Sequence, residues 1–351
     1  MIKITDSDFS AELNEQKRKV DFNTYDMSVK ELISMVGDGL IDIAPEYQRQ
    51  FRWDDDRQSV LAESIFLGIP VPSLYMATNK DGSWEVIDGV QRLSSIINFA
   101  AEIKSQARKK VNLKQPFKLT GLKKLSSFNG KLFSDLPKSI QLDFLLKPIK
   151  ITTLSDKSDK AVRFDLFERL NTGGIKLSNQ EIRSCIYRGQ FNDFLKKMST
   201  YKPFLKSIRL PKSMETDGTR EELVLRFFAY LFNYKDFDHS VVDFLNDYMD
   251  SASKKFDYAN NESLFTSVFD SLSRLSHGVI KTKSRVTTSI ILFEAVAVGA
   301  ALAYRKKGEI NIDGFYNWVS EKEFLSLMTG ATNTKSRVVK RIEHCRDRFI
   351  E

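Results

Sequence analysis

Residues 85–100, EVIDGVQRLSSIINFA, combine a strand, a tight turn and the start of a helix in one short stretch. The Asp88-Gly89 pair is a turn signal, and the apolar residues from Leu93 onward recur at helical spacing. The pattern therefore places Gln91 and Arg92 in the first turn of a helix. An amide and a guanidinium at that position raise the question of what they bind.

The elements on either side of this stretch can be predicted in the same way. WDDDRQSVLAESIFLGIPVP predicts a helix that begins near Asp54–Asp56 and stops at Gly68 and Pro70. PSLYMATNKDGSWEVID predicts a β-hairpin whose turn spans residues 79–82. The predicted order before residue 101 is thus helix, hairpin, helix.

The rest of the chain changes character after about residue 155. KPIKITTLS predicts one more strand, and residues 160–189 predict a helix, a glycine-rich loop and a second helix. From about Arg220 onward the segments are amphipathic or wholly apolar helices, such as EELVLRFFAYLF, in which Phe227 lies on the apolar face. We therefore expect an α+β protein whose C-terminal part is all-helical.

Composition excludes several classes of site and of protein. The chain has 351 residues and a formal charge of +8, which allows but does not show polyanion binding. Two cysteines without a CxxC pair, together with three scattered histidines, exclude a thiolate zinc site. No P-loop motif occurs, and neither a signal peptide nor a membrane span is predicted, so we expect a cytoplasmic protein.

The box Asp88-Gly89-Val90-Gln91-Arg92 has two interpretations. A helix N-terminus that follows a glycine turn attracts anions, and an arginine there adds a fork suited to phosphate oxygens. Alternatively, Asp88 caps an ordinary helix and the next polar residues are solvated. Spacing alone does not decide between them.

Two further segments carry more information about this box. PEYQRQFRW, residues 45–53, places two arginines and three aromatic residues in nine positions, and FERLNTGGIKLSNQEIR, residues 167–183, surrounds a glycine pair. Together with VIDGVQRL, these segments resemble the ParB-like domain of GmrSD-type modification-dependent restriction proteins. Val90 is a mild departure, because glutamine is common there in that family.

The resemblance implies a fold akin to ParB and sulfiredoxin and a domain that binds and hydrolyses nucleoside triphosphates. It implies a hydrolytic box formed by Asp88, Gln91 and Arg92. It also implies nucleotide contacts from Gly89, Gln48 and Arg49. The glycine-rich turn with Asn171, Gly173 and Gly174 can contact the nucleotide as well. A Mg²⁺ ion would be needed to bridge phosphate oxygens, and Asp88 is the first candidate for its ligand. In a purely structural interpretation, Asn171–Gly174 end a helix. Ser178 with Glu181 predicts a capping box for the next helix.

Two basic segments are candidates for contacts with DNA. Residues 104–124, which include Lys109 and Lys110, contain eight basic residues and no acidic one. The C-terminal helix contains Lys340 and Arg341 among further basic residues. Each segment is either a solvated surface or a contact with the phosphate backbone.

We therefore predict a ParB-like nucleotide-handling domain over residues 20–190, with a basic insertion near 104–124, and a helical domain over residues 191–351. The expected function is an NTP-dependent, DNA-sensing switch of a prokaryotic restriction or anti-phage system. Its partners would be modified or foreign DNA and a separate nuclease or defence-system subunit. A separate nuclease is expected because the three histidines do not form a His-Asn-His nuclease site. A homo-oligomer is also possible. The alternative is a non-enzymatic DNA-binding or scaffolding protein that retains the fold.

Overall fold

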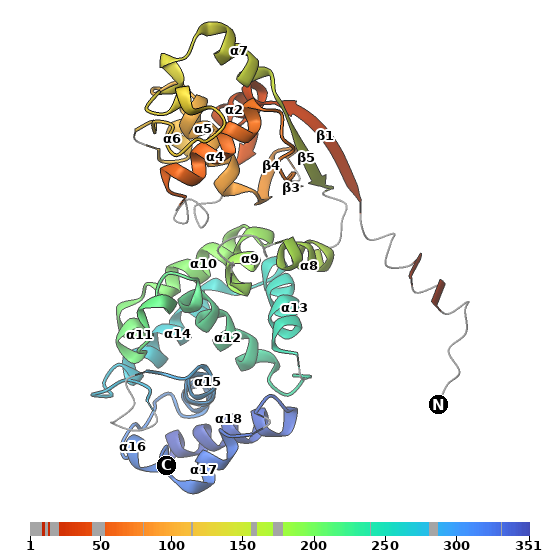
Figure 1. Cartoon of the computed structure of the whole chain (residues 1–351). Coiled ribbons are helices and arrows are strands. Elements are labelled where there is room, and N and C mark those ends of the chain that lie inside the picture. Colours follow the sequence, from red (N-terminus) through yellow and green to blue (C-terminus); the bar gives the residue numbers. More distant parts are fainter. Residues whose placement is uncertain are drawn as a thin grey trace. The chain divides into compact units, whose positions relative to one another are not determined.

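The computed structural model divides into two compact units, residues 1–176 and 177–351 (Figure 1). It describes residues 9–10, 13–14, 21–43, 53–79, 81–113, 115–155, 160–170, 178–238, 240–280, 287–330 and 332–351. The first unit contains a five-stranded sheet with helices, and the described part of the second is helical. The predicted α+β class is confirmed.

The first unit mixes strands and helices along the chain. Its elements are β1 (Phe22–Ser28), α2 (Val29–Asp38), β2 (Ile41–Asp42), α4 (Asp55–Phe66), β3 (Leu74–Thr78), β4 (Trp84–Asp88), α5 (Val90–Ala100), α6 (Gln106–Lys110), the 3₁₀ turns η1 (Ser126–Phe128) and η2 (Phe133–Asp135), α7 (Lys138–Leu146), β5 (Pro148–Leu154) and α8 (Lys160–Leu170). The predicted helix, hairpin and helix correspond to α4, β3 with β4, and α5. The predicted strand in KPIKITTLS is β5.

The sheet is mixed, with the strand order β1-β5-β3-β4-β2. β3 pairs antiparallel with β4 and parallel with β5, so that Met76 lies opposite Val86 on one side and Thr153 on the other. Helices α2, α4, α5 and α6 gather on one side of the strands (Figure 1). Arg163 of α8 donates hydrogen bonds to two carbonyl oxygens, that of Thr78 at the end of β3 at 2.8 Å and that of Ser155 just after β5 at 3.0 Å.

The second unit is built from helices around one core. They are α9 (Asn179–Ile186), α10 (Gln190–Ser199), α11 (Lys202–Ser207), the 3₁₀ turn η3 (Lys212–Met214), α12 (Thr219–Asn233), α13 (Val241–Lys254), α14 (Tyr258–Leu272), α15 (Ile290–Lys307), α16 (Phe315–Trp318), α17 (Lys322–Leu327) and α18 (Lys335–Ile350). Phe227, which the periodicity of α12 places on an apolar face, is fully buried against Phe228, Phe265 and Phe269. That prediction is confirmed.

Helices α15 and α18 cross closely in this core. A Cβ atom added to Gly299 of α15 would lie 2.5 Å from the Cβ of Cys345 and 2.8 Å from the backbone nitrogen of Arg346. Cys345, like Cys185, is a buried free thiol. Among the described residues, no helix has both the length and the apolar character to cross a membrane.

We expect Gly299→Ala to lower the free energy of unfolding by about 1–3 kcal/mol, because the added methyl group overpacks the α15–α18 contact. Gly37→Ala is the matched control: its added Cβ atom would meet its nearest neighbour at an ordinary 3.5 Å. In the last turn of α2, alanine instead favours the helix, by at most about 0.5–1 kcal/mol. Thermal unfolding followed by circular dichroism should show opposite shifts, and equal shifts would contradict the packing argument.

Candidate functional site

The predicted strand, turn and helix around residue 89 are present. β4 ends at Asp88, Gly89 adopts the left-handed conformation with φ 101°, and α5 begins at Val90. A Cβ atom on Gly89 would lie 2.4 Å from a methyl carbon of Leu74, so the packing of β3 requires glycine as much as the dihedral angle does. No side chain caps the N-terminus of α5.

Arg92 is held by the chain itself. Its Nη1 donates to the carbonyl oxygens of Pro72 and Ser73, the latter at 2.9 Å, and its Nη2 donates to Asp88 Oδ2 at 2.6 Å. Only 13% of the side chain is exposed. Burial lowers the pKa of the guanidinium, while the negative charge of Asp88 opposes that shift. Arg92 thus joins the start of β3 to the end of β4.

The contact with Arg92 bears on both roles considered for Asp88, the helix cap and the metal ligand. The carboxylate does not cap α5, because it accepts the Arg92 guanidinium instead. A metal ion at Asp88 would have to share the carboxylate with that guanidinium. Within the described residues, no group of three or more His, Cys, Asp or Glu side chains could hold a metal ion.

Gln91 connects the box to the segment before α4. Its Oε1 accepts a hydrogen bond from the backbone N–H of Trp53 at 3.3 Å. Trp53 is the last residue of the PEYQRQFRW segment, which is 38 positions earlier in the chain. The structure therefore brings one end of that segment into contact with the first turn of α5.

A line of buried polar side chains continues from Trp53 into the core. Gln58 Nε2 donates to the Trp53 carbonyl oxygen at 3.1 Å, and Gln58 Oε1 accepts from Asn98 Nδ2 at 2.9 Å. Arg108 then donates to Asn98 O at 2.6 Å and to Asn98 Oδ1 at 3.1 Å. Gln58 and Asn98 were not predicted from the sequence, although polar residues among the apolar positions of α4 and α5 were a visible signal.

Arg108 corrects the interpretation of residues 104–124 as a uniform basic surface. Its side chain is fully buried, and burial lowers its pKa. Lys109 and Lys110, which follow it on α6, are exposed. The surface prediction therefore applies to the lysines and not to this arginine.

Several predicted site residues lie outside the described part of the chain. These are Gln48 and Arg49 before α4, and Asn171, Gly173 and Gly174 between α8 and α9. The capping box that follows the glycines is confirmed, because Ser178 N–H donates to Glu181 Oε2 at 2.8 Å and Glu181 N–H donates to Ser178 Oγ at 3.2 Å.

The prediction that Arg341 contacts DNA is corrected. The side chain is fully buried, and it donates to Glu294 Oε2 at 2.8 Å and to the Thr332 carbonyl oxygen at 2.7 Å. Lys340, its neighbour on α18, is exposed. Of the two basic residues singled out on this helix, only the lysine is available to a partner.

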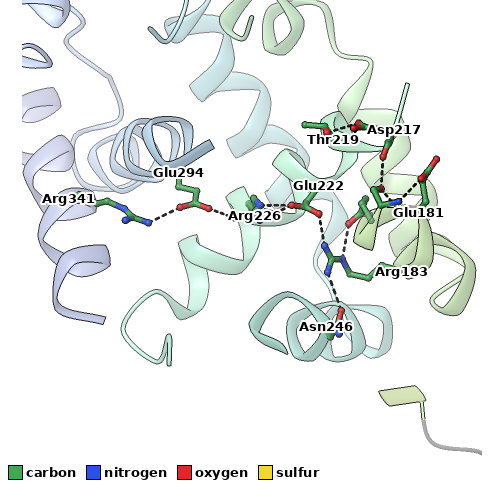
Figure 2. A network of polar contacts seen from close by, with 11 residues as sticks. Glu181, Arg183, Asp217, Thr219, Glu222, Arg226, Asn246, Glu294 and Arg341 are labelled. Atoms are coloured by element: carbon green, nitrogen blue, oxygen red, sulfur yellow. Dashed lines mark hydrogen bonds and ion pairs between the residues drawn. The ribbon is translucent and has the colours of Figure 1, made fainter. Parts of the chain in front are cut away.

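Arg341 ends a chain of five charged side chains that runs from α9 to α18 (Figure 2). Arg183 contacts Glu222 at 2.6 Å, Arg226 contacts Glu222 at 2.7 Å and Glu294 at 2.5 Å, and Arg341 completes the series. Burial alone would raise the pKa of Glu222, but Arg226 and Arg183 outweigh it and lower that pKa. The network is a structural element of the second unit.

Comparison with protein families identifies the first part of this chain. Residues 29–188 match the model of the family described as GmrSD restriction endonuclease, N-terminal domain. This stretch is similar to a GmrSD N-terminal domain. The predicted family is confirmed, and with it the coarser assignment to restriction systems. Searches of curated proteins and of solved structures gave no match.

The GmrSD box generates a prediction about stability. Arg92→Ala leaves two carbonyl oxygens and the Asp88 carboxylate without their donor, so we expect a loss of about 1–3 kcal/mol in the free energy of unfolding. This differs from the small effect expected of a solvated first-turn arginine. Urea denaturation measures it, with the exposed Lys104→Ala as control. Wild-type stability would show that water replaces the guanidinium.

The corrected role of Arg341 can be tested separately. Arg341→Met removes one of the two guanidinium partners of the buried Glu294 carboxylate, while Arg226 remains, and we expect a loss of about 1–3 kcal/mol in the free energy of unfolding. Lys340→Met on the exposed side of the same helix should stay within about 0.5 kcal/mol of wild type. Chemical denaturation compares the free energies of unfolding of the two variants. Equal values would mean that the buried contacts of Arg341 do not stabilise the fold.

Proposed function

We propose that this chain is a nucleotide-dependent, DNA-sensing switch of a prokaryotic restriction or anti-phage system. In this proposal the first unit binds a nucleoside triphosphate at the start of α5 and hydrolyses it. A separate subunit supplies nuclease activity. The GmrSD match supports the restriction context, and the geometry around Gln91 supports the location of the site.

The observation that carries the proposal is the contact between Gln91 and Trp53. It places the end of one family segment against the first turn of α5, a helix start that has no side-chain cap. Backbone N–H groups at such a turn, together with the positive end of the helix dipole, favour phosphate oxygens. Gln48 and Arg49 of the same PEYQRQFRW segment are further proposed nucleotide contacts.

The fixed position of Arg92 gives it a defined part in this proposal. Because both of its Nη atoms already donate, to carbonyl oxygens and to Asp88, it contributes a fixed positive charge beside the Gly89 turn. Such preorganised charge stabilises the charge that develops during phosphoryl transfer without a reorganisation cost. Gln91 has an amide beside the same turn, where it would orient the attacking water.

The residues present fit a triphosphate better than a protein-held metal. The Gly89 turn and the backbone of Gln91 would hold phosphate oxygens, with Asn171, Gly173 and Gly174 as further proposed contacts. Mg²⁺ would supply charge compensation on the phosphates, and in such sites it commonly keeps water and needs only one or two carboxylates. Asp88 is the carboxylate of the box and would contribute through the oxygen that Arg92 leaves available.

The proposed nucleic-acid partner is DNA, contacted by exposed lysines such as Lys109, Lys110 and Lys340. Exposed lysines release counterions from the phosphate backbone and bind without reading sequence. Recognition of a modification would then belong to a different part of the complex.

One observation favours the second candidate, a DNA-binding or scaffolding protein without turnover. Arg92 donates to Pro72, Ser73 and Asp88, which is the bonding pattern of an arginine that holds a turn together. The two candidates differ in whether the wild-type protein releases phosphate. The full chain should be assayed with ATP, GTP, CTP and UTP in Mg²⁺, with and without DNA.

We expect Gln91→Ala to retain nucleotide binding but to lose turnover by roughly 100-fold, because orienting water matters only during reaction. Gln106→Ala, at an exposed position of α6, is the matched control and should hydrolyse like wild type. Phosphate release and equilibrium nucleotide binding are measured on the same preparations. No release by wild type, combined with salt-sensitive DNA binding, would select the second candidate.

A further inference from the structure

The positive charge of this chain is concentrated in one segment. Between Glu102 and Asp135 there are nine lysine and arginine residues and no acidic residue. The whole chain carries only +8, so the remainder has a formal charge of −1. A segment that holds the entire charge excess is a candidate contact for a polyanion.

The structure shows that part of this segment is a closed loop. The loop of residues 118–131 is joined at its base, where Leu119 N–H donates to the Lys131 carbonyl oxygen at 2.9 Å and Gly130 N–H donates to the Leu119 carbonyl oxygen at 2.7 Å. Inside it, the Asn129 side chain accepts from Leu122 N–H at 2.9 Å and donates to Leu122 O at 3.1 Å. Compact surface loops with joined ends are frequently functional.

Helix α4 holds the same loop from outside. Glu63 Oε1 accepts hydrogen bonds from the backbone N–H groups of Lys124 and Leu125, at 3.0 and 2.9 Å. Ser59 Oγ accepts from Thr120 N–H at 2.9 Å. These bonds fix the backbone on which the lysines stand, which lowers the entropy lost when a ligand binds.

The lysine side chains of the loop remain available. Lys118, Lys123, Lys124 and Lys131 are all exposed, and among the described residues none pairs with a carboxylate. No large hydrophobic side chain between residues 115 and 134 is exposed. Peripheral membrane segments combine basic residues with exposed apolar anchors, whereas a phosphate backbone needs charge alone.

We propose that the loop of residues 118–131 is a preorganised binding surface for the DNA phosphate backbone, and that Glu63 is its positioning residue. This inference rests on the DNA partner proposed above but not on nucleotide turnover. Contacts of this kind hold the duplex and set its register without reading base sequence.

The charge can be tested on the full chain with a fluorescently labelled duplex, by anisotropy over about 50–200 mM salt. Lys123→Ala with Lys124→Ala should weaken binding and reduce the slope of log affinity against log salt by about 0.9 for each lost contact. The matched control removes Lys306 and Lys307, an exposed lysine pair at the end of α15, and should keep the wild-type slope. Equal slopes for the two double variants would overturn the proposal.

The positioning role has a different signature. Glu63→Gln keeps an oxygen acceptor for both N–H groups and should bind DNA like wild type. Glu63→Ala releases the loop and should lower affinity at every salt concentration while leaving the slope unchanged, because the lysines are still present. If Glu63→Ala binds DNA with wild-type affinity, the proposal that Glu63 preorganises the loop is wrong.

Two more measurements separate this proposal from the proposed nucleotide binding and from binding to anionic lipid. The lysine variants should bind nucleotide like wild type in the absence of DNA. If the wild-type protein binds no nucleotide, the proposed function is contradicted, but the DNA binding measured for the loop variants still tests the loop. Vesicles of mixed anionic and neutral phospholipid serve as the other polyanion. Vesicle binding as tight as DNA binding, lost in the same lysine variant, would overturn the assignment to DNA.

Discussion

The amide side chain of Gln58 is the contact on which the arrangement of the first unit depends. It is buried on α4, where it donates to the Trp53 carbonyl oxygen and accepts from Asn98 of α5. A buried amide must have partners on both sides, since an unsatisfied polar group in the core costs about 1–3 kcal/mol. This requirement fixes α4 against α5, and so it fixes Trp53 beside Gln91.

The same helix organises two surfaces with different chemistry. Through Gln58 it positions the turn at the start of α5, and through Ser59 and Glu63 it holds the lysine loop. Arg92 holds the turn from the strand side, so contacts within the chain fix the box at Asp88–Arg92.

Local signals in the sequence were sufficient for the helix, hairpin and helix, for the strand at Pro148–Leu154 and for the Ser178–Glu181 capping box, because each depends on residues close together in the chain. Arg108 and Arg341 could not be assigned in this way. A buried arginine and a solvated one look identical in sequence, and the partner of Arg341 lies 47 positions away on another helix. The family resemblance located the box at Asp88–Arg92, but the clamp that Arg92 makes to Pro72 and Ser73 depends on the packing of β3.

The buried Arg183 has a consequence for how modules of this kind are exchanged in evolution. The GmrSD match extends to residue 188, yet the compact unit changes at residue 177, and Arg183 of α9 contacts Glu222 and Asn246 of the second unit. A chimaera joined after residue 188 would therefore bury Arg183 against a foreign helical module, in which a carboxylate and an amide would be needed at the positions of Glu222 and Asn246. A junction before residue 177 would move α9 together with its partners. Recombination between relatives should accordingly favour breakpoints inside the matched stretch, with α9 inherited as part of the helical module.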